Sequence, residues 1–91
     1  MAEVHLPKTL VELFAGLHPV VSADGATVGD VLGSLTESHP DTKSQIFGEG
    51  GDLNRYVNVY LNDEDVRVLD GLTTPVGIDD RIDVLAAITG G

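Results

Sequence analysis

The sequence has no cysteine or tryptophan and contains only five basic residues. Without a thiol, disulfides, thiolate catalysis, cysteine-ligated zinc and iron–sulfur clusters are excluded, and a reducing compartment is favoured. The basic residues are scattered along the chain: Lys8, Lys43, Arg55, Arg67 and Arg81. Because phosphate binding needs clustered lysines and arginines, this distribution argues against a nucleic-acid partner.

Long hydrophobic runs are also missing. No stretch approaches the roughly 20 apolar residues that a membrane-spanning helix needs. The N-terminal segment contains an acidic residue, Glu3, where a secretory signal would carry basic ones. We therefore expect a cytoplasmic protein with no membrane association.

The chain is short and strongly acidic. Its 91 residues include 15 acidic and five basic side chains, for a formal net charge of −10. A chain of this length forms one domain that buries about two-thirds of its unfolded surface, which leaves little room for an interior active site. With 42% hydrophobic residues it has enough apolar surface for a core. The acid excess favours a basic protein as partner.

The clearest helix signal runs from Thr27 to Ser38. Thr27 is a candidate N-cap with Asp30 three residues later, and Pro40 follows the end. Four apolar residues fall at i, i+3, i+4 and i+7, namely Val28, Val31, Leu32 and Leu35. This spacing predicts an amphipathic helix with one face buried.

Two glycines, Gly29 and Gly33, lie inside this predicted helix. Each costs about 1 kcal/mol relative to alanine in a helix interior. Their presence therefore predicts a helix that packs closely against a sheet instead of depending on strong intrinsic helicity.

Strand patterns occur on both sides of the helix. The candidate strands are 4–6, 19–23, 55–61, 66–69 and 81–88. Strict alternation places Val57, Val59 and Leu61 on one face of the third. The connection 41–54 is polar and glycine-rich, with room for one helical turn, and 62–65 reads as a turn.

This order of elements predicts an α+β fold of the β-grasp type, with one main helix packed across a mixed four- to five-stranded sheet. The first and last strands would lie at the centre of the sheet and run parallel. We expect a domain over residues 1–88 and a flexible tail over 89–91 that ends in Gly90-Gly91.

The diglycine is the feature with evident chemistry. Without a Cβ, Gly90 gives the backbone clearance to enter a narrow channel, and Gly91 offers its α-carboxylate. Adenylation by ATP would make this carboxyl an acyl donor, and a sulfur nucleophile would then leave a thiocarboxylate. The alternative is that the diglycine is a frayed terminus without function.

Three segments together resemble the ubiquitin-like sulfur-carrier proteins, which include the small subunit of molybdopterin synthase and the thiamin sulfur carrier. They are Thr27-Val28-Gly29-Asp30-Val31-Leu32, the segment 55–67, and the closing strand with Gly90-Gly91. The part from Val57 to Arg67 is most similar to the carrier of O-phosphoserine-dependent cysteine biosynthesis. Ala86-Ala87-Ile88-Thr89 departs from a commoner Pro-Ala-Val-Ala run, which leaves the sulfur acceptor open.

The resemblance implies a consumable carrier that is not itself an enzyme and binds no cofactor. A ubiquitin-activating-like adenylyltransferase would use ATP to activate Gly91, and a cysteine synthase-like enzyme or a synthase large subunit would accept the sulfur. In the cysteine pathway a zinc metalloprotease releases the product. Two alternatives remain open: a ubiquitin-like modifier joined to lysines through Gly91, or a regulatory subunit that does not use its terminus.

A docking patch is expected on the last strand. Leu85 and Ala87 face outward there, and with Tyr56, Tyr60 and Ile88 they would form an apolar surface for the activating enzyme. The alternative is that the helix or a loop covers these side chains.

Other motifs are read as structural. Asp63-Glu64-Asp65 lacks the glycine and the late bidentate glutamate of a calcium-binding EF-hand loop, so it predicts a solvated turn. The histidines are too far apart in sequence for a metal motif. Gly48-Glu49-Gly50-Gly51 lacks the lysine of a P-loop and predicts a flexible loop.

Overall fold

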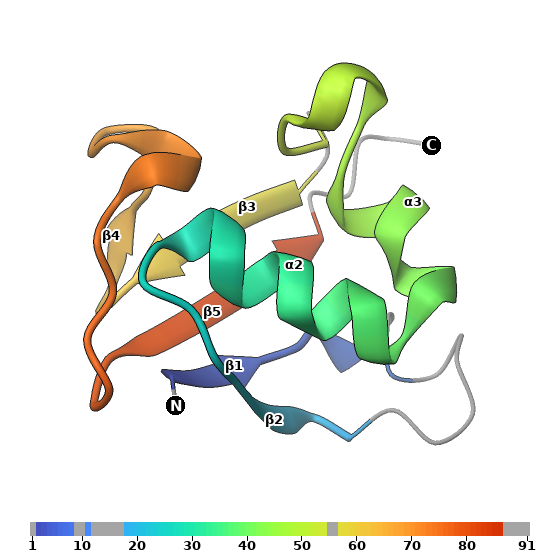
Figure 1. The fold of residues 1–91 in the computed structure, drawn as a ribbon, viewed down its shortest axis with the longest axis horizontal. Helices are drawn as coiled ribbons and strands as arrows, with labels where there is room; N and C mark the ends of the chain where they lie inside the picture. Colours follow the sequence, from blue (N-terminus) through green and yellow to red (C-terminus); the bar gives the residue numbers. More distant parts are fainter. Residues whose placement is uncertain (1, 9–10, 12–17, 55–56, 87–91) are drawn as a thin grey trace.

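The computed structural model describes residues 2–8, 11, 18–54 and 57–86, and these form two layers (Figure 1). A mixed sheet lies behind helix α2, which crosses one of its faces. The strands are β1 (Ala2–His5), β2 (Val20–Ala23), β3 (Val57–Leu61), β4 (Glu64–Asp65) and β5 (Arg81–Ala86). The helices are α2 (Val28–Ser38) and α3 (Lys43–Ile46), with 3-10 turns at Pro40–Thr42, Glu49–Gly51 and Gly71–Thr73.

The sheet has five strands in the order β2-β1-β5-β3-β4. β1 and β5 are parallel, with Glu3 opposite Arg81, and the other pairs are antiparallel. The predicted parallel pairing of the first and last strands is confirmed, with β5 at the centre of the sheet and β1 beside it. The inward side chains of β5, Ile82 and Val84, are buried, because they share the core with the apolar residues of α2.

Helix α2 forms where the sequence predicts it. The Thr27 hydroxyl accepts a hydrogen bond of 3.2 Å from the backbone N–H of Asp30, which caps the first turn. The apolar stripe is buried against the inner face of the sheet, and it consists of Val28, Val31, Leu32 and Leu35. Burying each such side chain contributes about 1.5–3 kcal/mol, so packing on the sheet outweighs the weak helix propensity of the glycines.

The two helix glycines differ from the prediction, since neither packs on the sheet. A Cβ on Gly29 would lie 3.0 Å from the carbonyl oxygen of Leu72, because the turn Gly71–Thr73 lies against the start of α2. A Cβ on Gly33 would meet no atom within 4 Å among the described residues, apart from its chain neighbours and the adjacent helix backbone. Close packing therefore explains one of the glycines, and the contact is with a loop.

The predicted strand 66–69 is wrong. The tight turn consists of Asn62 and Asp63, whose φ angles of 49° and 72° lie in the left-handed region that such two-residue hairpin turns use. The return strand is therefore Glu64–Asp65, and one further ladder bond joins Val66 N–H to the Val59 carbonyl at 3.0 Å. The chain then turns, which leaves Val66 buried but Val68 exposed.

The connection 41–54 contains the single helical turn that was expected, α3, flanked by 3-10 turns. Ile46 is fully buried, and Phe47 and Leu53 pack against the core. This segment lies beside the C-terminal half of α2 (Figure 1).

Across residues 2–8, 11, 18–54 and 57–86, none of the helices has the length and apolarity required to cross a membrane. The predicted boundary between residues 88 and 89 and the tail 89–91 lie outside the described residues.

Candidate functional site

The candidate site lies on the surface of the sheet opposite α2, which we call the outer face. Leu85, on β5, points to this face and is 48% exposed. Helix α2 does not cover it, because Val84 and Ile82 on the same strand point to the buried side that faces the helix. An exposed leucine on a rigid central strand is suited to contact another protein.

Strand register brings Tyr60 to the same surface. Tyr60 lies opposite Asp83 and Asn58 lies opposite Leu85, so Tyr60 and Leu85 are diagonal neighbours on adjacent strands. Tyr60 is half-buried. The structure therefore places two of the five predicted patch residues together.

The remaining predicted site residues lie outside the described part of the chain. They are Tyr56, Ala87, Ile88, Gly90 and Gly91. Their roles stay predictions.

The outer face is charged toward the start of β5. Asp83 accepts hydrogen bonds from Arg81 at 3.1 Å (Nε) and 3.0 Å (Nη2), and its side chain is only 16% exposed. This carboxylate raises the pKa of the Arg81 guanidinium. On the adjacent β1, His5 Nε2 lies 2.6 Å from Glu3 Oε1. The surface thus changes from ion-paired to apolar along β5 toward Leu85.

A polar network fixes the entry to β5. Asp80 accepts hydrogen bonds from the Gly77 N–H at 2.6 Å and from the Asn62 amide at 3.1 Å, which together lower the pKa of its carboxyl. Asn62 also accepts from the Arg81 N–H at 3.0 Å. The β3–β4 hairpin is thereby tied to the strand that carries Leu85.

Arg67 is a neighbour of the site that sequence reasoning missed. Its guanidinium donates to the Asn58 side chain at 3.0 Å and to the Asn54 carbonyl at 3.1 Å. Since Asn58 lies opposite Leu85, Arg67 adds a cation beside the exposed leucine. This contact depends on the hairpin turn, which folds residue 67 back along β3, so the sequence alone does not predict it.

Metal binding finds no support in the part of the chain that the structure describes. No three His, Asp or Glu side chains there are grouped to hold an ion. Asp63, Glu64 and Asp65 form the hairpin, and Asp65 accepts a bond of 2.9 Å from the Arg67 N–H. The predicted turn is correct for Asp63, whereas Glu64 and Asp65 form strand β4.

The mixed sheet, the single crossing helix and the parallel central pair define a ubiquitin-like β-grasp protein. The chain belongs to the ThiS family, which residues 4–91 match.

Among its relatives is the sulfur carrier protein CysO of Mycobacterium tuberculosis, which is 35% identical over 85 residues covering 91% of each chain. The small archaeal modifier protein 1 of Haloferax volcanii is 36% identical over 88% of this chain and 97% of its own. A chain of the crystal structure of the Amycolatopsis orientalis BexX/CysO complex superposes with a TM-score of 0.87 at 35% identity over the full length of both chains. This is a family of sulfur carriers and ubiquitin-like modifiers.

Proposed function

We propose that the chain is a sulfur carrier whose reactive group is the α-carboxylate of Gly91. The observation that carries the proposal is that the ThiS match extends through Gly90 to Gly91, so the diglycine lies within the shared region. The likeness to CysO over nine-tenths of both chains supports the same role.

The proposed cycle begins with activation. A carboxylate oxygen of Gly91 attacks the α-phosphorus of ATP in a partner adenylyltransferase, and pyrophosphate leaves. A hydrosulfide then attacks the acyl carbon and AMP leaves, which gives a thiocarboxylate. Gly90 adds no side chain, so the backbone can reach the partner's nucleotide. Because activation consumes ATP, we place the cycle in the cytoplasm.

Discharge returns the carrier to its starting form. The thiocarboxylate sulfur forms a bond to an electrophilic carbon held by a biosynthetic enzyme, and that carbon either loses a leaving group or passes the electron pair of its π bond to a neighbouring atom, which takes up a proton. Water then cleaves the acyl–sulfur bond, which restores the carboxylate and frees the sulfur on the product. A cysteine synthase-like acceptor fits the likeness to CysO; there the product stays attached to the carrier until a zinc metalloprotease releases it. The chain is thus a co-substrate that its partner enzymes load and unload.

The outer face would dock the activating enzyme. Leu85 supplies an exposed apolar contact, and Arg67 and Tyr60 border it. We extend this surface to Tyr56, Ala87 and Ile88. A central leucine with a polar border is the usual composition of a protein interface.

Intact-mass spectrometry tests the proposal. After coexpression with an activating enzyme and a sulfide source, a chain confirmed to end at Gly91 should gain the mass difference between sulfur and oxygen. Deletion of Gly90 and Gly91 should abolish the gain. Leu85→Asp should keep the native circular dichroism but fail to load, whereas Ile78→Asp, at an apolar side chain that is also exposed, should load normally. Full loading of Leu85→Asp would remove the outer face from the docking surface.

A second candidate is a protein modifier, which the 36% identity to the archaeal modifier protein favours. The activated Gly91 carboxyl would then be attacked by a lysine amine of a target, with loss of AMP. Tryptic peptides that carry the remnant 82–91 on lysines of other proteins would support this role, because trypsin cleaves after Arg81, the last basic residue of the chain. If loading occurs and no such remnant forms, the carrier role stands alone.

A further inference from the structure

The far side of the molecule from the outer face carries a groove along α2, which we call the helix groove. Its main part, of about 1000 Å³, lies between α2 and the segment 40–51. A smaller hollow of about 440 Å³ continues along the helix toward its start. Gly33 and Glu37 line both hollows, so the two form one continuous surface.

The floor of the groove is bare helix backbone at Gly33. Two other glycines line the smaller hollow, and contacts within the chain explain why each is glycine. A Cβ on Gly25 would lie 2.5 Å from the Val31 nitrogen, and a Cβ on Gly29 would lie 3.0 Å from the Leu72 oxygen. Within the part of the chain that the structure describes, a Cβ on Gly33 has no such contact within 4 Å. Packing within the chain thus gives no reason for glycine there, and the position leaves space for an atom from outside.

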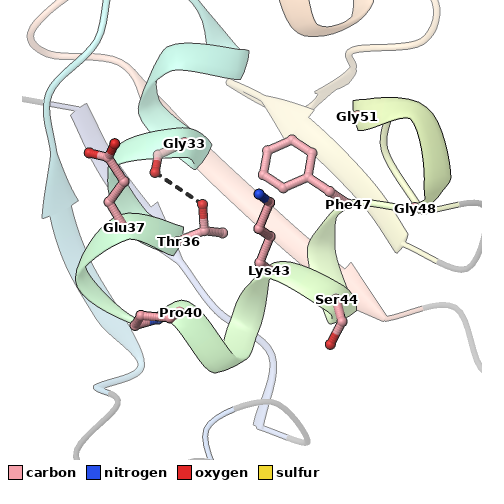
Figure 2. A pocket seen from close by; sticks show the side chains of 9 residues that line it. All are labelled: Gly33, Thr36, Glu37, Pro40, Lys43, Ser44, Phe47, Gly48 and Gly51. Carbon is pink, nitrogen blue, oxygen red and sulfur yellow. Dashed lines mark hydrogen bonds between the residues drawn. The ribbon is translucent and has the colours of Figure 1, made fainter.

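The main hollow has an apolar wall. Figure 2 shows the Phe47 ring turned toward α2, and Pro40 lies at the other end of the segment that faces the helix. The Thr36 hydroxyl donates to the Gly33 carbonyl at 3.0 Å, so this polar group is satisfied within the helix (Figure 2). The groove offers an apolar side chain a site between Phe47 and the Gly33 backbone.

The charge of the groove selects its occupant. Asp24, Asp30 and Glu37 line it, and Lys43 is its basic lining residue. This excess of acid on a chain of charge −10 disfavours a second copy of the same chain and attracts a basic segment.

We propose that the helix groove docks a basic segment of a partner protein, with one apolar side chain of that segment seated over Gly33. The groove lies on the opposite layer from Leu85, so this partner and one bound to the outer face occupy separate surfaces. The inference does not depend on the chemistry of Gly91.

Nuclear magnetic resonance titration of the full chain tests this inference. The probe is a synthetic amphipathic peptide of lysine and leucine, with a lysine–glycine peptide and a glutamate–leucine peptide as controls. We expect saturable shifts of amide signals in 24–37 and 40–51 with the first peptide alone. Gly33→Leu fills the site and should weaken binding about tenfold, as expected for loss of one well-seated contact.

Paired variants separate local recognition from overall charge. Glu37→Gln should weaken binding more than Glu64→Gln, which removes the same charge from β4. Should Gly33→Leu fail to fold, the charge reversal Glu37→Lys gives an independent arm. Equal effects of the two glutamine variants, shifts spread over all acidic residues, or unchanged binding by Gly33→Leu would overturn the proposal. Concentration-dependent shifts of the same signals without peptide would assign the groove to a second copy and would also overturn it.

Discussion

Gly29 and Gly33 lie one turn apart on α2, yet they meet different surroundings. A Cβ added to Gly29 would lie against Leu72, whereas a Cβ added to Gly33 would point into the open helix groove. Alanine raises helix stability relative to glycine by about 1 kcal/mol where nothing obstructs the methyl group. The same substitution should therefore stabilise the chain less at Gly29 than at Gly33.

We predict that Gly33→Ala raises the free energy of unfolding by about 0.5–1 kcal/mol. Gly29→Ala should gain less or lose stability, because its methyl group would lie 3.0 Å from the backbone oxygen of Leu72. Urea unfolding of both variants beside the parent protein measures the difference. Equal stabilisation by the two substitutions would contradict the packing described at Gly29.

At the scale of the element, the entry to β5 depends on a carboxylate. Asp80 is held by the Gly77 N–H and the Asn62 amide, and both contacts favour its ionised form. Because the folded-state pKa lies below the ordinary value of 3.8, the folded chain binds this proton more weakly than the unfolded chain. The contribution is fully present above pH 3.8 and is lost as the pH falls through the lowered pKa.

We therefore predict a pH-dependent effect of Asp80→Asn. Near neutral pH the variant should be less stable than the parent protein, since it lacks the charge that the two donors stabilise. The difference should shrink as the pH is lowered below 3.8. Urea unfolding at a series of pH values checks this, and a difference of constant size across the series would rule out the assigned cause.

The elements differ in how far the sequence predicts them. Helix α2 is confirmed, and the strand expected at 55–61 is confirmed over its described part, β3, because the apolar spacing and the Thr27 cap are local signals. The strand expected at 66–69 was wrong. Val66 and Val68 alternate as they would in a strand, but the left-handed turn consists only of Asn62 and Asp63, so the returning strand begins at Glu64 and ends at Asp65.

The candidate site shows the same division between local and tertiary information. Alternation along the last strand suffices to turn Leu85 outward, and the structure confirms that it is exposed. The contact of Arg67 with Asn58 and the open space over Gly33 arise from tertiary packing, so the local sequence pattern does not predict them.

At the scale of the whole molecule, charge governs encounter. The net charge of −10 extends over a compact body whose Cα radius of gyration is 11.9 Å. Acidic side chains occur on both layers, including Asp30 on α2 and Asp79 before β5. Such a field speeds association with basic partners more than it slows their dissociation.

Raising the salt concentration should therefore slow the association of the chain with the activating enzyme that we propose as its partner. Counterions screen charges over about 8 Å at physiological ionic strength, so the association rate should fall steeply while the dissociation rate changes little. Stopped-flow kinetics at several salt concentrations measures both rates. An association rate that does not vary with salt would exclude electrostatic steering.

The parallel pairing of β1 with β5 has a consequence during synthesis on the ribosome. Glu3 and Val4 pair with Arg81 and Ile82, which are far away in the sequence. The two central strands can therefore pair only after nearly every other element has been translated. A nascent chain interrupted before residue 81 leaves β1 and β3 without the strand that joins them. The sheet can thus be completed only when its last strand has been synthesised. Prematurely terminated chains should therefore be degraded by proteolysis.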